Sequence, residues 1–248
     1  MPNTTDAYGN ALMDCLLGNE DHYVIEREDG FLDVGDLKYY FSEYDQWGAI
    51  EKRMPEFVNG RVLDVGCGAG RHSLHLQSLG YEVVGIDVSA LGIEVAKQRG
   101  VKNAVAISVD ELVEMADPGL GVFDSIIMMG HNIGLFHDFE TGKKILSRFA
   151  EITSPTARIV GTTRDLGVTI KPHHIAYQES NLKRDRMRGQ IRFRIRHGMF
   201  ASSWYDYLFV NEDELCQMIQ GTGWRLETTI YGEGGFGGTS YLAVLCKE

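Results

Sequence analysis

The residues best suited to chemistry in this chain form a glycine loop, at residues 62–70. A short apolar run ends there in three glycines spaced two apart, Gly66, Gly68 and Gly70, with Cys67 between the first two. Glycines of this kind let a ligand approach the backbone closely and allow conformations that side chains disfavour. The helix expected after the loop presents unpaired N–H groups at its first turn. The pattern therefore predicts a binding site for a nucleotide-type cofactor.

Two acids accompany the loop. Asp64 lies just before the glycines, and Asp87 closes the next predicted strand. A carboxylate at that strand end can accept both ribose hydroxyls of an adenosine. The dinucleotide fingerprint G-x-G-x-x-G requires a third glycine where this chain has Arg71. The spacing therefore disfavours a nicotinamide-dependent oxidoreductase, which is kept as a competing hypothesis.

The run VLDVGCGAGRHSLHLQSLGYEVVGIDVS resembles motif I through the second strand of class I S-adenosylmethionine (SAM)-dependent methyltransferases. The resemblance covers residues 55–165 well, and GCGxGRxSLxL is especially similar to small-molecule and tellurite-resistance members. It implies SAM as cofactor and S-adenosylhomocysteine (SAH) as product. It places the three glycines around the methionine part, with Asp64 on the amino group and Asp87 on the ribose. The further implied contacts are Cys67, Arg71, Val88 and Met129, with an adenine contact at Ser108, Val109 or Asp110.

Residues 129–134 follow the fourth predicted strand, whose end faces the reactive methyl group in this family. Transfer from a sulfonium is an in-line displacement that requires an aligned lone pair, exclusion of water and, in some cases, a base. His131 is the best-placed base, with the alternative that it caps the strand or orients the cofactor. Asn132 either positions the acceptor or closes the turn.

An aromatic run at residues 39–47 lies before motif I, where the family commonly has a lid. Its aromatic side chains are suited to pack around a sulfonium through cation–π contacts, and Tyr40 is the third catalytic candidate. Tyr40 and Tyr44 are spaced to share one face of a helix. The alternative is an ordinary amphipathic helix that covers the edge of the sheet.

A basic stripe at residues 183–196 has seven Lys and Arg and one acid, whereas residues 1–60 have 13 acids and four Lys and Arg. The stripe has three interpretations: a solvated strand face, a partner for the acidic N-terminal segment, or a site for an anionic acceptor such as RNA. Aromatic residues do not interleave with the arginines on the basic face of the predicted strand, which disfavours nucleic acid. His173 and His174, expected in a loop, and the pair His72 and His75 lack a suitable third ligand, so no metal site is predicted.

Strands and helices alternate from residue 61 onward, and the mostly apolar strands imply a parallel sheet covered on both faces. The resemblance to the methyltransferases implies a Rossmann-like, doubly wound α/β sheet of seven strands in the order 3-2-1-4-5-7-6, with the last strand antiparallel. Residues 1–55 are expected to form a helical lid. Residues 56–248 form the SAM-binding domain, with a hairpin inserted at about 163–210 and a glycine-rich turn at 232–238.

Composition sets the remaining limits. The 248 residues have a net charge of −11, which disfavours a general partner of nucleic acid or anionic membranes. We expect no signal peptide and no membrane span, and four cysteines without a CxxC pair favour reduced thiols in the cytoplasm. The predicted function is methyl transfer to an N, O or S atom of a small molecule. A methyltransferase of RNA or protein and a SAM-binding module without transfer activity are kept as alternative functions. A homodimer is kept as a possible assembly.

Overall fold

The computed structural model describes residues 5–233 and 239–248. The predicted glycine-rich turn lies mostly at 234–238 and so outside the described residues. By its internal contacts the chain divides into two compact units, each built from three separate segments. The first unit comprises residues 1–47, 64–109 and 192–205, and the second comprises residues 48–63, 110–191 and 206–248.

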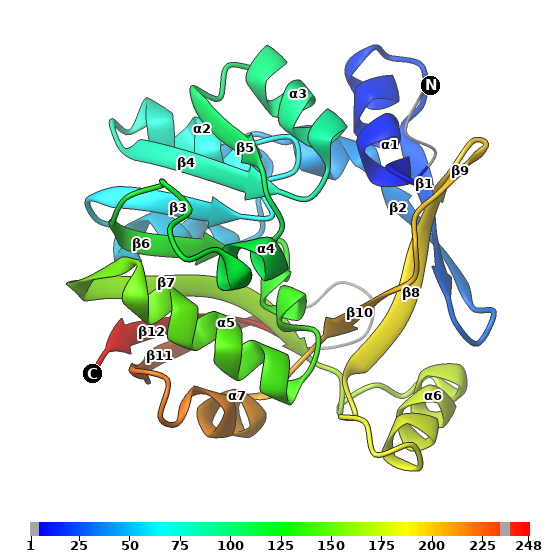
Figure 1. The fold of residues 1–248 in the computed structure, drawn as a ribbon. Coiled ribbons are helices and arrows are strands. Elements are labelled where there is room, and N and C mark those ends of the chain that lie inside the picture. Colours follow the sequence, from blue (N-terminus) through cyan, green and yellow to red (C-terminus); the bar gives the residue numbers. More distant parts are fainter. Residues whose placement is uncertain (1–4, 234–238) are drawn as a thin grey trace. The chain divides into compact units, whose positions relative to one another are not determined.

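The larger sheet has seven strands in the order β11-β12-β7-β6-β3-β4-β5 (Figure 1). Numbered along the sheet-forming part of the chain, this is the order 3-2-1-4-5-7-6, so the prediction is confirmed. β12 is antiparallel to both β7 and β11, whereas β6 and β7, like β4 and β5, are parallel. The strands are β3 (Arg61–Val65), β4 (Glu82–Asp87), β5 (Asn103–Ala106), β6 (Phe123–Met128), β7 (Thr153–Asp165), β11 (Trp224–Glu233) and β12 (Thr239–Lys247).

Capping side chains mark the start of helices between these strands. The Ser89 side chain accepts from the N–H of Gly92, and the side chain of Asn211 forms a capping box with Glu214. No helix within the described ranges is both long and apolar enough to cross a bilayer. The helices are α2 (Arg71–Ser78), α3 (Ala90–Gln98), α4 (Val109–Glu114), α5 (Phe139–Glu151) and α7 (Glu212–Ile219).

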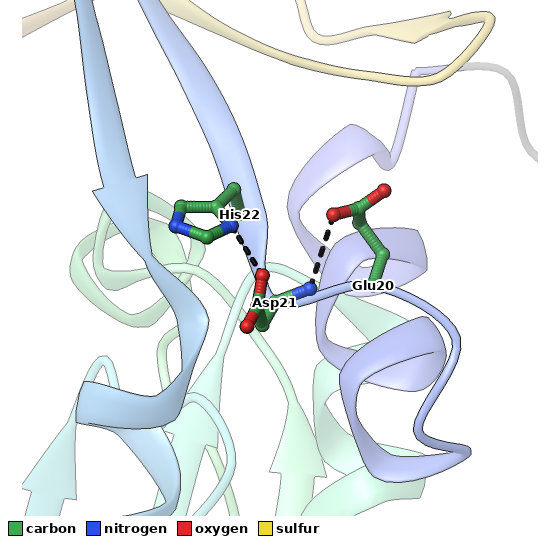
Figure 2. A group of neighbouring side chains, drawn as sticks. All are labelled: Glu20, Asp21 and His22. Carbon is green, nitrogen blue, oxygen red and sulfur yellow. Dashed lines mark hydrogen bonds and ion pairs between the residues drawn. The ribbon is translucent and has the colours of Figure 1, made fainter.

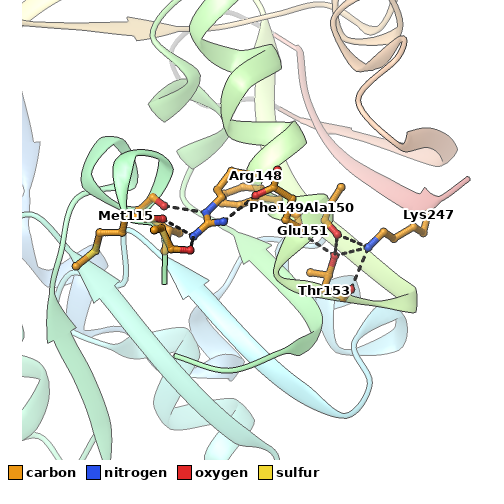
Figure 3. A network of polar contacts seen from close by, with 9 residues as sticks. Met115, Arg148, Phe149, Ala150, Glu151, Thr153 and Lys247 are labelled. Atoms are coloured by element: carbon orange, nitrogen blue, oxygen red, sulfur yellow. Dashed lines mark hydrogen bonds and ion pairs between the residues drawn. The ribbon is translucent and has the colours of Figure 1, made fainter. Parts of the chain in front are cut away.

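Two long basic side chains secure helix ends in the second unit (Figure 3). Arg148 of α5 donates from Nε to the carbonyl of Leu112 (3.1 Å) and from Nη2 to that of Met115 (2.6 Å). Lys247 donates to the carbonyl oxygen and the hydroxyl of Thr153, at 3.0 Å each. These contacts satisfy carbonyls that a helix leaves unpaired at its C-terminal end or just beyond it.

The N-terminal segment is only partly helical, which corrects the prediction of a helical lid. After α1 (Ala7–Leu16) it forms a hairpin of β1 (His22–Arg27) and β2 (Leu32–Asp36), followed by short 3-10 helices. Residues 22–25, His-Tyr-Val-Ile, include an aromatic tyrosine and the β-branched valine and isoleucine, which favour a strand. β1 pairs with β8, so this hairpin belongs to a second sheet of order β10-β8-β1-β2.

The aromatic run does not form one helix, so Tyr40 and Tyr44 do not share a helix face. Tyr40 lies in η1 (Leu37–Phe41) and Tyr44 in η2 (Tyr44–Gln46), and Ser42 between them is extended. The reason is local capping: the side chain of Asp36 caps η1, and Glu43 begins a new capping box for η2. A third 3-10 helix, η3 (Glu51–Phe57), precedes β3.

The segment inserted after β7 contains the predicted strands and one helix that was not predicted. β8 (Gln190–His197) pairs with the short β9 (Phe200–Ala201) and neighbours β10 (Tyr205–Leu208). The loop predicted at His173 and His174 is wrong, because α6 (Pro172–Leu182) begins there. Proline is favoured at the first helical position, and here it starts the helix instead of marking a loop.

Candidate functional site

The glycine loop closes the end of β3 through the backbone of β4. The N–H groups of Gly66 and Cys67 both donate to the carbonyl of Ile86, at 2.8 and 3.0 Å. Gly66, Gly68 and Gly70 have φ values of 73°, 51° and 79°, a region that side chains disfavour. Gly70 is also the N-cap of α2, which begins at Arg71. The three spaced glycines are therefore required by the backbone path of the loop.

Asp87 holds this loop from the end of β4. Its Oδ2 accepts from the N–H of Gly68 (2.9 Å), and its Oδ1 accepts from the N–H of Ser89 (2.8 Å). The side chain is buried, and burial raises the pKa of this carboxyl while the two backbone donors oppose the shift. Asp87 thus ties the turn after β3 to the turn after β4.

Asp64 is the second buried acid beside the loop. Its Oδ2 accepts a hydrogen bond of 2.6 Å from the hydroxyl of Ser73 on α2. Burial raises the pKa of Asp64 to about 6, the Ser73 bond counteracts this, and the charge of Asp87 adds to it. A cation arriving at this carboxylate would relieve an unfavourable buried charge.

Arg71, which stands where a dinucleotide site would have glycine, attaches the aromatic run to the loop. Its guanidinium lies 3.8 Å from the ring centroid of Tyr39 and 5.5 Å from that of Trp47, and it donates to the hydroxyl of Ser42 (3.0 Å). Arg99 also joins the aromatic run to the loop: its Nη1 donates to the carbonyl of Tyr40 (3.2 Å) and to that of Ala69 (2.6 Å). The first unit therefore brings the predicted lid residues and the predicted cofactor residues together.

A cluster of three tyrosines covers the same loop. The hydroxyls of Tyr23 and Tyr40 lie 2.7 Å apart, and the Tyr8 ring packs edge-on against Tyr40 with centroids 5.3 Å apart. A Cβ atom built on Gly68 would lie 3.1 Å from the Tyr8 hydroxyl. Burial raises the pKa of Tyr8 and of Tyr40, so these hydroxyls stay protonated at neutral pH. The sequence did not single out Tyr8 and Tyr23, because no local spacing relates them to Tyr40.

The remaining predicted cofactor residues differ in exposure. Val88 is 77% exposed, whereas Val109, a candidate adenine contact, is buried. Asp110 lies in the first turn of α4, and its carboxylate contacts the ring of His137 at 3.2 Å. An adenine contact at these positions stays a prediction.

In the second unit, His131 follows β6 in an unusual conformation. Its φ is 70°, and hydrogen bonds to Thr162, Tyr207 and Arg164 hold it in place. Its N–H donates to the hydroxyl of Thr162 (2.8 Å), its carbonyl accepts from Tyr207 (2.8 Å), and its Nε2 accepts from Nε of Arg164 (2.9 Å). A nitrogen that accepts a hydrogen bond offers no open lone pair, so this arrangement does not favour His131 as a base.

The neighbours of His131 have structural roles in the second unit. Met129 is buried, and its carbonyl accepts from the N–H of Asn132 (3.4 Å). Asn132 begins the 3-10 helix η4 (Asn132–Phe136), and its Oδ1 lies 3.4 Å from the Tyr207 hydroxyl. The sequence did not single out Arg164 or Tyr207, because no local spacing relates either residue to His131.

The basic stripe is paired with the acidic N-terminal segment in two places. Arg194 of β8 makes a bidentate ion pair with Glu26 of β1, at 2.9 and 3.1 Å, and Arg196 contacts the same carboxylate at 3.0 Å. These arginines lower the pKa of Glu26. Of the three interpretations of the stripe, the structure supports intramolecular pairing for Arg194 and Arg196.

One acidic cluster lies apart from these groups, at Glu20, Asp21 and His22 (Figure 2). Asp21 accepts from Nζ of Lys38 (2.5 Å) and contacts the ring of His22, so its charge is already balanced. Glu20 accepts from the N–H of Asp21 at 3.2 Å. Residues 20–22 therefore form a surface turn held by ion pairs and hydrogen bonds.

Comparison with known proteins relates the loop region to a family. Residues 62–156 match the model of a methyltransferase domain. Magnesium-protoporphyrin O-methyltransferase from Rhodobacter capsulatus is 38% identical over 81 residues, which are 31% of this chain and 35% of that protein. Ubiquinone biosynthesis O-methyltransferase from Rhodopseudomonas palustris is 38% identical over 104 residues, 42% of this chain and 39% of that protein. The matches thus span about two fifths of these relatives.

The solved structures include a SAM-dependent methyltransferase from Bacteroides fragilis in complex with SAH. The two chains are 24% identical, and the alignment covers 100% of this chain and 97% of the other with a TM-score of 0.81. This similarity confirms the Rossmann-like α/β fold of the described residues.

Proposed function

We propose that this chain, whose residues 62–156 form a methyltransferase domain, binds SAM and transfers its methyl group to an N, O or S atom of a small molecule. One observation carries the proposal: two buried acids, Asp64 and Asp87, flank a glycine loop whose backbone is held open by left-handed conformations. Buried carboxylates are costly unless they meet cations or hydrogen-bond donors. SAM offers both, in its ammonium group and its ribose hydroxyls.

The polar groups of the first unit match the ammonium, ribose and carboxylate groups of SAM one by one. Asp64 would hold the ammonium, Asp87 the ribose, and the N–H groups at the start of α2 the methionine carboxylate. The Tyr8 and Tyr40 rings would pack near the sulfonium, because aromatic faces attract cations. When bound, SAM supplies an electrophilic methyl group, and these residues orient it and exclude water.

Residues 1–55 would act as the lid of this site, before the domain at 56–248. Helix α1 is anchored beside Asp87, since Asp6 accepts from the Ser89 hydroxyl (2.8 Å) and from the N–H of Leu91 (3.2 Å). The same carboxylate caps α1 by accepting from the N–H of Gly9 (2.9 Å). These contacts support a lid whose position depends on the end of β4.

Several observations support a small-molecule acceptor. Two relatives are named as O-methyltransferases of magnesium-protoporphyrin and of ubiquinone biosynthesis, which favours oxygen as the methylated atom. Arg194 and Arg196 are paired with Glu26, so these two cations are less available to bind the phosphates of an RNA.

The four cysteines are free thiols, which supports a cytoplasmic location.

Isothermal titration calorimetry with SAM, SAH and NAD tests the proposal. We expect SAM and SAH to bind and NAD to bind at least about tenfold more weakly, a difference of about 1.4 kcal/mol. Tighter binding of NAD would refute the cofactor assignment. Release of SAH from SAM should then depend on a low-molecular-weight fraction of a cell extract. Release that depends only on the macromolecular fraction would refute the small-molecule acceptor.

A further inference from the structure

Helix α1 is attached at its two ends to different parts of the first unit. At its N-terminal end, Asp6 accepts hydrogen bonds from Ser89 and Leu91 in the turn after β4. At its C-terminal end, Oδ2 of Asp14 lies 2.8 Å from Nε2 of His197, the last residue of β8. The two acids are about 12 Å apart along the helix, at 1.5 Å per residue. The helix is therefore held by the turn after β4 and by β8.

The apolar face of α1 joins the glycine loop and β8 in one core. Ala7, Ala11 and Leu12 of α1 are fully buried in a cluster that also contains Ala69 of the loop and Ile195 of β8. Side chains in such a cluster are close-packed, so a displacement of one element is felt by the others. A change on β8 can therefore reach the loop through α1.

The ring of His197 lies between two hydrogen-bond acceptors. Its Nε2 faces the Asp14 carboxylate, and its Nδ1 is 3.2 Å from the carbonyl oxygen of His22 on β1. A carbonyl and an ionised carboxylate accept hydrogen bonds but donate none, so either neutral tautomer would leave one ring nitrogen facing an oxygen without a proton between them. The positively charged ring satisfies both contacts. Its side chain is 6% exposed, so water does little to replace a lost partner.

Asp14 supplies the negative charge that faces this ring. It is the one charged residue within Ala7–Leu16, and its second carboxylate oxygen lies 3.4 Å from the side-chain amide of Asn19. β9, whose Phe200 pairs in register with His197, has no charged side chain. Other charged side chains of β1 and β8 form ion pairs of their own, His22 with Asp21, Arg27 with Asp29, and Glu26 with Arg194 and Arg196. The pair of His197 and Asp14 is thus separate from the remaining charges of these strands.

We infer that His197 is a positioning residue for the cofactor site: its charged ring, paired with Asp14, holds α1 against the glycine loop and so slows the exchange of SAM and SAH. Tyr8 of α1 lies against this loop, because a Cβ atom built on Gly68 would be 3.1 Å from its hydroxyl. Movement of α1 is therefore coupled to the exchange of a ligand at the loop. This inference rests on the proposed function and adds a residue of the inserted segment to the control of its site.

NMR spectra of ligand-free protein labelled with 15N-histidine test the charge of the ring. We expect both ring nitrogens of His197 to carry a proton at neutral pH, and one of these protons to be lost in Asp14→Asn. The resonances are assigned from His197→Gln. His22→Gln is the matched control, because the His22 ring also contacts an aspartate but is 56% exposed, and it should leave the His197 signals unchanged. A singly protonated His197 ring in the wild type, or a doubly protonated one in Asp14→Asn, would overturn the inference.

The dissociation rate of SAH tests the positioning role, measured by chasing tritiated SAH with an excess of unlabelled SAH. We expect dissociation to be about tenfold faster in His197→Gln than in the wild type, and unchanged in His22→Gln. The charged ring forms the contact, so the wild-type rate should rise as pH rises and the ring loses its proton. His197→Gln should remove this dependence on pH, a result that a merely structural role would not give.

Urea unfolding shows that each variant is folded under the conditions of the chase. Equal rates in the wild type and His197→Gln, or the same dependence on pH in both, would refute the positioning role while leaving the proposed function intact. Calorimetry on the wild type separates the two proposals, because failure to bind SAH at all would refute the proposed function and this inference with it.

Discussion

The substitution Asp87→Asn gives the sharpest test of the cofactor site. In the protein the carboxylate accepts one N–H from Gly68 and one from Ser89, at 2.9 and 2.8 Å. Asparagine keeps the shape but offers one acceptor oxygen, and its NH2 group would face an N–H donor. The ribose would also lose its anionic partner. Each hydrogen bond to a charged group contributes about 1.5–3 kcal/mol. Loss of two such bonds predicts a Kd for SAH raised by about a hundredfold, or about 3 kcal/mol.

The assay is calorimetry with SAH, accompanied by urea unfolding of each variant. Asp117→Asn is the matched control, because Asp117 also accepts an N–H from the residue two positions on, at 2.8 Å, but in an exposed loop. We expect the control to bind SAH like the wild type. If Asp87→Asn binds SAH within about threefold of the wild type, equivalent to about 0.6 kcal/mol, the ribose assignment is refuted. The urea midpoint shows whether the variant is folded when this comparison is made.

Three further predictions concern the first unit. Burial raises the pKa of Asp64 to about 6, so the folded protein retains a proton that the unfolded chain loses near pH 4. The free energy of unfolding should therefore fall as pH rises between these values, while the affinity for SAH rises. Asp64→Asn should flatten both pH profiles, and an unchanged profile would contradict the assignment. Gly9→Ala should lower the free energy of unfolding in urea by about 1–3 kcal/mol, because its Cβ would overlap the Ser89 side chain. Gly48→Ala, with open space around it, should leave this free energy unchanged. Equal effects of the two substitutions would refute the tight packing of α1. Glu26→Gln should lower the urea midpoint at neutral pH. The wild type should lose the same stability as pH falls through the lowered pKa of Glu26. A midpoint that the substitution leaves unchanged would show that the ion pairs contribute nothing to stability.

The part of the fold that follows from local sequence was predicted correctly. Alternating apolar strands and helices predicted the doubly wound sheet, and the family resemblance supplied its strand order, which the structure confirms. Ser89 and Asn211, which begin α3 and α7, are residue types that favour the start of a helix. The hairpin of β1 and β2 was missed because its pairing partner, β8, lies far away in the chain. Local propensity cannot show that Ile195 of β8 joins the same core as Leu12 of α1.

The site shows the same division. The loop glycines with Asp64 and Asp87 come from one continuous motif, so their adjacency in the first unit was predictable. The contacts that determine the His131 ring come from Arg164 and Tyr207, at sequence separations of 33 and 76. Nothing in the spacing of these residues indicates that a hydrogen bond joins them.

The ion pair between Glu26 and Arg194 also bears on how the chain folds as it is made. The two residues are 168 positions apart, so β1 leaves the ribosome long before β8 exists. At roughly 5–20 residues per second, the N-terminal hairpin waits for about 8–34 s. Its exposed strand edge is open to wrong partners during that interval, and the cluster of acids in the first 60 residues would repel other nascent copies. The acidic N-terminal segment would therefore protect a strand edge that is completed late in synthesis.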